Sequence, residues 1–166
     1  MKLEEYDFDE LLRAAAKSEV NSREVYEYLS DRTDNFVIKN RFEFLAGEEK
    51  KHQDFITDLY EKRNPNEQMN VPEETPVPIP FIRYGDDVEE SEIVDQAMDA
   101  EVSARDFYRK MAEIARDEGE SGEPVKLLDY LSGMEQNHYE ILKSELERIK
   151  EFEEFDQYHP AMHQGP

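Results

Sequence analysis

The sequence contains the same two-part pattern twice. Residues 19–26 read EVNSREVY and residues 101–108 read EVSARDFY, which share Glu, Val, Arg and Tyr at matching places. Each is followed by a second matching stretch, LAGEEKKH at residues 45–52 and LSGMEQNH at residues 131–138. A chain that repeats two helical motifs in this order is predicted to form two helical hairpins that pack together.

Helical periodicity extends well beyond these motifs. Apolar residues recur at three- and four-residue spacings over four stretches, which predicts four amphipathic helices and an all-α fold. A cap at Thr33 or Asp34 is expected before the second helix, and Pro124 suits the first turn of the fourth. The predicted helices cover residues 7–31, about 35–63, about 87–117 and about 124–154.

The two predicted hairpins are joined by a proline-rich segment at residues 64–87. It holds five of the eight prolines, which excludes a continuous helix and favours an extended path. Such a segment can span on the order of 80 Å, whereas each helix is only about 40 Å long. We therefore expect a crossover along the full bundle, with VPIPFIRY at residues 77–84 packing along it. A contact between chains, or an exchange of hairpins, is the alternative role for this stretch.

The domain boundaries follow from the same pattern. Residues 1–154 are expected to form one four-helix bundle. Residues 155–166 lack periodicity and are predicted to be a flexible tail, so His159 and His163 are not assigned to a site.

Composition excludes several classes of function. A formal net charge of −22 disfavours nucleic acid and anionic membranes as partners. The chain has no cysteine, so any metal must be held by carboxylate and imidazole. No apolar run approaches the ~20 residues of a membrane span, and no leader is recognisable, which predicts a cytoplasmic protein.

Each second motif places a glutamate and a histidine on the buried face of its helix. Glu49 and His52 are three residues apart and share a stripe with Leu45 and Ile56. Glu135 and His138 repeat this arrangement with Leu128, Leu131, Leu142 and Ile149 in the other half. Buried carboxylates cost several kcal/mol each unless they are protonated or compensated, and no lysine or arginine lies on these stripes.

Two divalent cations would provide the compensation. Four glutamates carry four negative charges, two such cations carry four positive charges, and two neutral imidazoles complete the coordination. Oxygen and imidazole ligands without thiolate suit iron or manganese, and zinc can also occupy such a site. The candidate ligands are Glu19, Glu49, His52, Glu101, Glu135 and His138.

A glutamate from each of two helices and Glu-x-x-His from the other two is the pattern of ferritin-like dinuclear bundles. From about residue 8 to residue 154 the chain resembles the ferritin-like di-iron proteins, and especially the rubrerythrins. The resemblance implies a ferritin-like four-helix bundle that holds two iron ions. It makes Glu19 and Glu101 terminal ligands, Glu49 and Glu135 bridges between the metals, and His52 and His138 the cap of one metal each.

The resemblance also gives a role to Tyr26 and Tyr108. They would hydrogen-bond the carboxylates and supply a proton or an electron, whereas an aromatic at helical spacing can also be core packing alone. Gly47 and Gly133 are expected to permit close helix approach or relieve crowding near the metals, and Glu48 is expected to be solvated.

Two departures from the rubrerythrin pattern affect the expected activity. Rubrerythrins usually carry a rubredoxin domain with CxxC pairs, so this cysteine-free chain would need an external electron donor protein or no reductase. They also carry an extra glutamate at the place of Ala104, associated with metal movement during peroxide reduction.

The expected function is therefore a di-iron oxidoreductase that reduces peroxide or dioxygen. The alternatives are a ferroxidase or iron-handling protein that takes Fe(II) as substrate, and a non-enzymatic metal-stabilised scaffold. A homodimer or higher homo-oligomer is expected.

Overall fold

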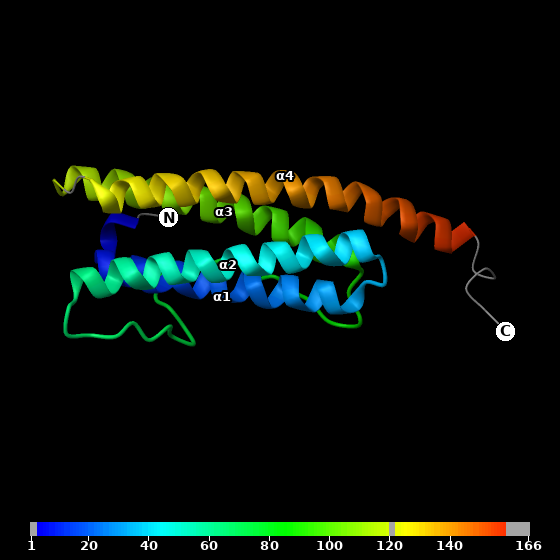
Figure 1. The fold of residues 1–166 in the computed structure, drawn as a ribbon, viewed down its shortest axis with the longest axis horizontal. Coiled ribbons are helices and arrows are strands. Elements are labelled where there is room, and N and C mark those ends of the chain that lie inside the picture. Colours follow the sequence, from blue (N-terminus) through cyan, green and yellow to red (C-terminus); the bar gives the residue numbers. More distant parts are fainter. Residues whose placement is uncertain (1–2, 120–121, 159–166) are drawn as a thin grey trace.

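A computed structural model describes residues 3–119 and 122–158 of the chain, and all its regular elements are helical (Figure 1). A short 3₁₀-helix, η1, precedes four long α-helices. The elements are η1 (Leu3–Glu5), α1 (Phe8–Arg32), α2 (Phe36–Arg63), α3 (Glu90–Asp117) and α4 (Glu123–Tyr158). Over the described residues there is no strand, and the predicted all-α four-helix bundle is confirmed.

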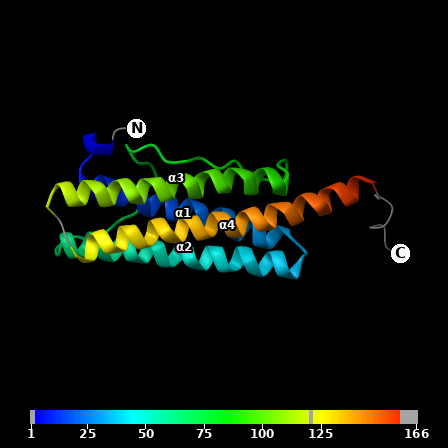
Figure 2. The same ribbon diagram turned by 90° about the horizontal axis from the view of Figure 1, so that it is seen from above.

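The four helices form two antiparallel hairpins, α1 with α2 and α3 with α4 (Figures 1 and 2). The connection at residues 64–89 leaves α2 at one end of the bundle and reaches α3 at the other. As a result α2 and α3 run in the same direction. Helices α1 and α2 of the first hairpin correspond to α3 and α4 of the second, as the repeated sequence motifs predict. In both views α4 extends beyond the other three helices.

The start of α2 differs from the prediction. The N-cap is Asn35, whose Oδ1 accepts hydrogen bonds from the backbone N–H groups of Val37 (3.0 Å) and Ile38 (3.3 Å). The expected cap at Thr33 or Asp34 is wrong, because Thr33 serves as the C-cap of α1. Its Oγ1 accepts a hydrogen bond from the Asn35 N–H (3.3 Å), so both helix ends share one short turn.

Helix α3 starts two or three residues later than the predicted start near Asp87 or Val88. Gly85 adopts a φ of 155° and its carbonyl accepts a hydrogen bond from the Val88 N–H at 3.1 Å, which turns the chain before the helix begins. Val88 is buried in the core beside this turn. Helix α3 accordingly begins at Glu90.

The end of α4 lies at Tyr158, four residues beyond the predicted end of the bundle. The helix therefore includes the first part of the segment expected to be a tail. Residues 159–166, with His159 and His163, lie outside the described residues.

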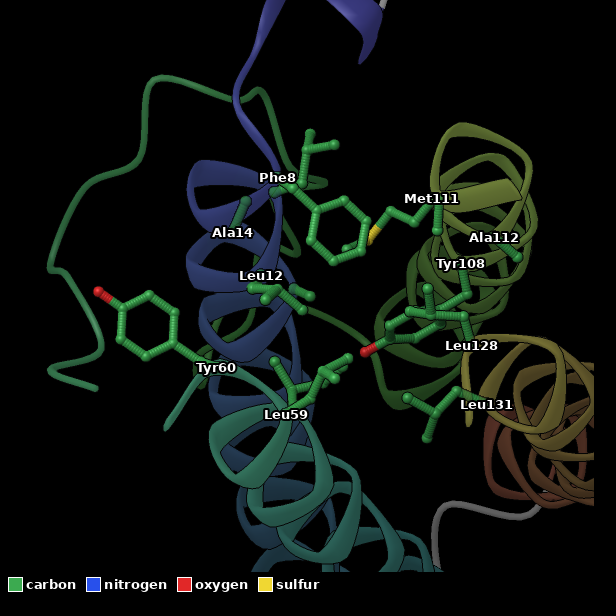
Figure 3. Close-up of a cluster of buried hydrophobic side chains, with 14 of the residues drawn as sticks. Phe8, Leu12, Ala14, Leu59, Tyr60, Tyr108, Met111, Ala112, Leu128 and Leu131 are labelled. Atoms are coloured by element: carbon green, nitrogen blue, oxygen red, sulfur yellow. The ribbon is translucent and has the colours of Figure 1, made fainter. Parts of the chain in front are cut away.

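The core consists of two apolar clusters, one toward each end of the bundle. The first includes Leu12 and Leu59 from one hairpin and Leu128 and Leu131 from the other, which face one another in Figure 3. The second is built on Leu29, Phe42, Leu45, Ile93 and Leu142. Polar side chains occupy the layer between these clusters, so the site is held from both sides by close-packed apolar groups.

The crossover packs against the bundle as predicted. Val77 is fully buried in the first cluster and Ile82 is buried in the second, so the segment contacts both ends of the core. Phe81, between them in sequence, is 86% exposed. No helix in the described part of the chain combines the length and the apolarity that crossing a membrane requires.

Candidate metal centre

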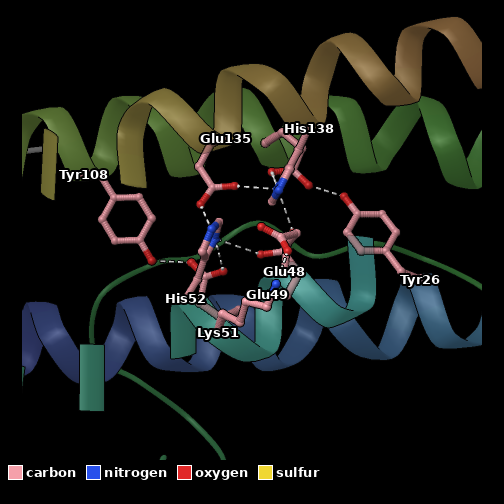
Figure 4. A network of polar contacts seen from close by, with 10 residues as sticks. Tyr26, Glu48, Glu49, Lys51, His52, Tyr108, Glu135 and His138 are labelled. Carbon is pink, nitrogen blue, oxygen red and sulfur yellow. Dashed lines mark hydrogen bonds and ion pairs between the residues drawn. The ribbon is translucent and has the colours of Figure 1, made fainter. Parts of the chain in front are cut away.

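The six predicted ligands meet in the layer between the two apolar clusters. Figure 4 labels four of them, Glu49, His52, Glu135 and His138. Helix α1 supplies one glutamate, α3 supplies one, and α2 and α4 each supply a glutamate and a histidine. Every one of these side chains is between 1% and 3% exposed. They are Glu19, Glu49, His52, Glu101, Glu135 and His138.

The His52 imidazole faces three carboxylates. Its Nδ1 lies 3.0 Å from Oε1 of Glu135, 3.4 Å from Oε2 of Glu49 and 3.6 Å from Oε2 of Glu19. Three helices thus direct oxygen atoms at one nitrogen of a side chain on α2. This grouping defines the first half of the centre.

The His138 imidazole repeats the arrangement on the opposite side. Its Nδ1 lies 3.0 Å from Oε1 of Glu49, 3.1 Å from Oε2 of Glu135 and 3.8 Å from Oε2 of Glu101. Glu49 and Glu135 therefore belong to both halves, and each presents one oxygen to one imidazole and the other oxygen to the second imidazole. A carboxylate can bridge two ions when its oxygens are divided in this way.

The polar atoms of this layer are poorly satisfied by protein groups. Within the described residues, seven buried atoms of the central four side chains lack a hydrogen-bond partner, including both nitrogens of each imidazole and both oxygens of Glu135. Buried polar groups are ordinarily paired, so such a concentration of unpaired polar atoms favours this layer as a site for a cation. Ligand atoms of Glu49, His52, Glu135 and His138 all lie within 4.8 Å of one another.

These spacings fit metal coordination. Oxygen and nitrogen ligands bind at about 2.0–2.2 Å, which places neighbouring ligand atoms of one ion about 3–4 Å apart. The contacts between each imidazole Nδ1 and its three carboxylates are 3.0–3.8 Å. The donor set contains only carboxylate and imidazole, which suits iron, manganese or zinc.

Without metal, the charges of this layer can be balanced only by protons, which requires side chains with strongly shifted pKa values. Burial lowers the pKa of the His52 imidazole, but close contacts with Glu135, Glu19 and Glu49 outweigh it and raise the pKa to about 12. The pKa of His138 is raised by the same kind of contact, with burial again opposing it. Burial raises the pKa of Glu135, yet the two imidazoles lower it to about 2.

Glu101 and Glu49 hold their protons more tightly than free carboxyl groups, first because they are buried and then because neighbouring carboxylates repel them. Burial and the charge of Glu135 raise the pKa of Glu101 to about 8 despite its contact with His138. Burial, followed by the charges of Glu101 and Glu135, raises the pKa of Glu49 well above its usual value. Metal cations would take the place of these protons.

Tyr26 and Tyr108 flank the centre from opposite ends (Figure 4). Each is fully buried, and the hydroxyl of each donates a hydrogen bond to a glutamate of the other hairpin. Tyr26 donates to Glu101 and Tyr108 donates to Glu19. Burial and the neighbouring carboxylates raise the pKa of both phenols well above 10, so they remain donors.

Sequence reasoning did not find this crossed pairing, although the signal was present. A tyrosine seven residues after a glutamate on the same helix lies about 10 Å along the axis, too far to bond that glutamate. It can only reach the carboxylate of another helix.

Two expectations about neighbouring residues are wrong. A Cβ placed on Gly47 or Gly133 meets no atom within 4 Å, and both glycines lie on the exposed side of their helices. Close helix approach near the centre therefore does not require glycine. The side chain of Glu48 is only 12% exposed and pairs with Lys51, so it is not fully solvated.

Fold and site together define a ferritin-like bundle with a buried Glu/His centre able to bind metal. The family profile for rubrerythrin matches residues 10–156, and the chain belongs to the rubrerythrin family. A solved structure of a hypothetical protein from Pyrococcus furiosus is also similar, with 31% sequence identity and a TM-score of 0.74. The similarity covers 91% of this chain and 95% of that one. Comparison with curated proteins gave no match.

Proposed function

We propose that the protein is a di-iron oxidoreductase that reduces peroxide or dioxygen at a Glu₄His₂ dinuclear centre. The observation that carries the proposal is the division of the Glu49 and Glu135 oxygens between the two imidazoles. Glu19 and Glu101 then each serve one ion, together with His52 and His138 respectively. Membership of the rubrerythrin family supports iron as the metal.

The chain's own groups hold the centre and control its protons. When bound, two iron ions supply two electrons, one each on passing from Fe(II) to Fe(III). Tyr26 and Tyr108 fix the terminal carboxylates by hydrogen bonds and place a phenolic proton at each end of the site. The apolar clusters on both sides limit the entry of solvent.

The metal assignment is tested by loading the protein with Fe(II) without oxygen and measuring the bound metal. We expect two irons per chain, and we expect Glu49→Ala and His52→Ala to lose metal. Glu48→Ala is the matched control, since Glu48 is adjacent in sequence but contacts Lys51 rather than the centre. Unchanged metal content in the two site variants would refute the assignment.

The activity is tested by mixing the loaded protein separately with peroxide and with oxygen. Rapid oxidation of the two bound irons, with continued turnover only when a reductant is supplied, is the expected result. A reductase or other donor protein would provide those electrons in the cell. No oxidation by either oxidant would leave a metal-stabilised scaffold.

Iron handling is the second candidate, and the net charge of −22 favours it because an acidic surface attracts cations. In that case Fe(II) is the substrate. Oxidation of many equivalents of Fe(II) per chain without added reductant would distinguish a ferroxidase from the proposed oxidoreductase.

We also propose that residues 1–154 function as one domain and that copies of the chain associate. The 86% exposure of Phe81 on the crossover supports an intermolecular contact. Sedimentation velocity of the wild type and of Phe81→Ser tests this proposal, and a monomeric wild type would refute the association.

A further inference from the structure

One pocket reaches the centre from outside. It has a volume of about 470 Å³ and lies between η1, α1, α3 and residues 78–80 of the crossover. Glu19 and Tyr108 line it and are themselves buried, so they form its inner end. Its outer rim includes the exposed side chains of Glu4 and Asp106.

This pocket makes the two halves of the centre unequal. The contacts of His52 and His138 are nearly equivalent, but the pocket contains the Glu19 and Tyr108 pair and not the Glu101 and Tyr26 pair. The pockets beside Gly47, Phe55 and Asn35 contain none of the six candidate ligands. A molecule entering this pocket meets the Glu19 half.

The pocket is larger than the volume that the smallest oxidants occupy. A water molecule takes about 30 Å³ of liquid volume, and hydrogen peroxide and dioxygen are of similar scale. The pocket is more than ten times larger and falls within the usual range for organic ligands, about 300–1,000 Å³.

The walls of the pocket are apolar and largely preformed. Its apolar lining includes Ala15, Pro78, Ile79, Pro80, Ala104 and Phe107. Two prolines restrict the backbone of the crossover wall, so little ordering is required when a ligand binds. Ala104 contributes only a methyl group to the α3 wall, which leaves room for a larger molecule.

The charges around the pocket disfavour an anionic occupant. Glu4, Glu19 and Asp106 are acidic, and the one basic lining residue is Lys110. The Lys110 Nζ is already paired with Glu4 at 2.8 Å and with Glu113 at 3.3 Å. A neutral apolar molecule is the best match.

We infer that the substrate is a neutral organic hydroperoxide, ROOH, whose apolar group occupies this pocket and whose peroxide group faces Glu19 and Tyr108. The inference rests on the proposed function for its electrons. In ROOH + 2H⁺ + 2e⁻ → ROH + H₂O the O–O bond breaks, one oxygen remains on the alcohol and the other leaves as water. The electrons are the two already assigned to the metal pair, and solvent supplies the protons.

Binding is tested without metal or turnover. The probe is 2-phenyl-2-propanol, the alcohol formed from cumene hydroperoxide, titrated into the full-length metal-free protein and followed by NMR. Ala104→Leu is expected to weaken binding about tenfold or more by filling the pocket. Ile79→Asn should also weaken binding of the alcohol, because it makes the pocket wall polar. Since Ile79 lies on the crossover, this substitution does not alter a helix.

Ser22→Leu is the matched control because Ser22 occupies the place of Ala104 in the other copy of the repeated motif. It does not line the pocket, so the affinity for the alcohol should remain within about twofold of wild type. Absence of binding to the wild type, or equal loss in the Ser22→Leu control, overturns the pocket assignment whatever the metal does.

Turnover separates this inference from the proposed function. With iron-loaded protein of measured iron content, the ratio of kcat/KM for cumene hydroperoxide to that for hydrogen peroxide should fall about tenfold in Ala104→Leu and Ile79→Asn. A protein that reduces hydrogen peroxide but not cumene hydroperoxide overturns the substrate class and leaves the proposed function intact. A protein that reduces neither overturns both.

Discussion

Replacing Tyr26 by Phe removes one buried hydrogen bond and leaves the packing volume almost unchanged. The Tyr26 ring is fully buried in the second apolar cluster, and its hydroxyl donates to Glu101, which is 2% exposed. The substitution therefore isolates the hydrogen bond from the cavity cost that Tyr26→Ala would add.

The cost should depend on the charge of the acceptor. With a pKa of about 8, Glu101 is mostly uncharged at pH 7 in the metal-free protein, where a neutral hydrogen bond contributes about 1 kcal/mol. Metal binding requires the ionised carboxylate, to which a hydrogen bond contributes about 2 kcal/mol. For a chain of this size each kcal/mol lowers Tm by about 2–4 °C. We expect losses of about 2–4 °C without metal and about 4–8 °C with zinc.

The assay is thermal unfolding followed by circular dichroism, with chelator in one series and with redox-inert Zn(II) in the other. Tyr139→Phe is the control, because Tyr139 packs against the same cluster and its hydroxyl has no hydrogen-bond partner within residues 3–119 and 122–158. If the two variants lower Tm equally in the zinc series, Tyr26 acts only as a core aromatic and the reasoning is refuted.

Three further predictions follow from the site and its surroundings. Because the His52 pKa is raised to about 12, the metal-free imidazole holds a proton at neutral pH that the metal must displace. The apparent Zn(II) affinity should therefore rise from about pH 6 to pH 8, and calorimetry in buffers of different ionisation enthalpy should detect proton release. A Zn(II) affinity that does not change with pH would contradict the assignment. Chelation of metal present at about 100 times the Kd of each site should remove about 2.7 kcal/mol of stability per bound ion, or about 5–10 °C in Tm for each, and an unchanged Tm would show that metal does not bind the native state selectively. Gly47→Ala and Gly133→Ala should each stabilise by up to about 1 kcal/mol in denaturant titration, because an added Cβ meets open space on an exposed helical face; destabilisation would reveal a need for glycine there.

The sequence was sufficient to predict the fold and the polar side chains that meet in the buried layer. A 3.6-residue period is local, so spacing alone places Glu49 beside His52 on the apolar face of one helix. The internal repeat then requires Glu135 and His138 to occupy the same place in the second hairpin. The prediction of a metal site then followed from charge, because buried carboxylates without a neighbouring lysine or arginine need another cation.

Helix ends were predicted less well because they depend on competition between neighbouring groups. Thr33 and Asn35 are both good caps by residue type, and the choice between them depended on where α1 ended. The start of α3 depended on the burial of Val88 beside the Gly85 turn. Such competition involves tertiary contacts that a periodic pattern does not contain.

Tertiary structure alone decided how the two hairpins relate. The repeat implies two equivalent halves, yet the crossover lies beside Glu19 and Tyr108, and the pocket forms at that half. The crossed hydrogen bonds of Tyr26 and Tyr108 likewise depend on the separation of α1 and α3. Sequence periodicity determines which face of a helix is buried, whereas the space between helices depends on how all the side chains pack. Because of that packing, the two halves of a duplicated sequence form a centre with a pocket on one side only.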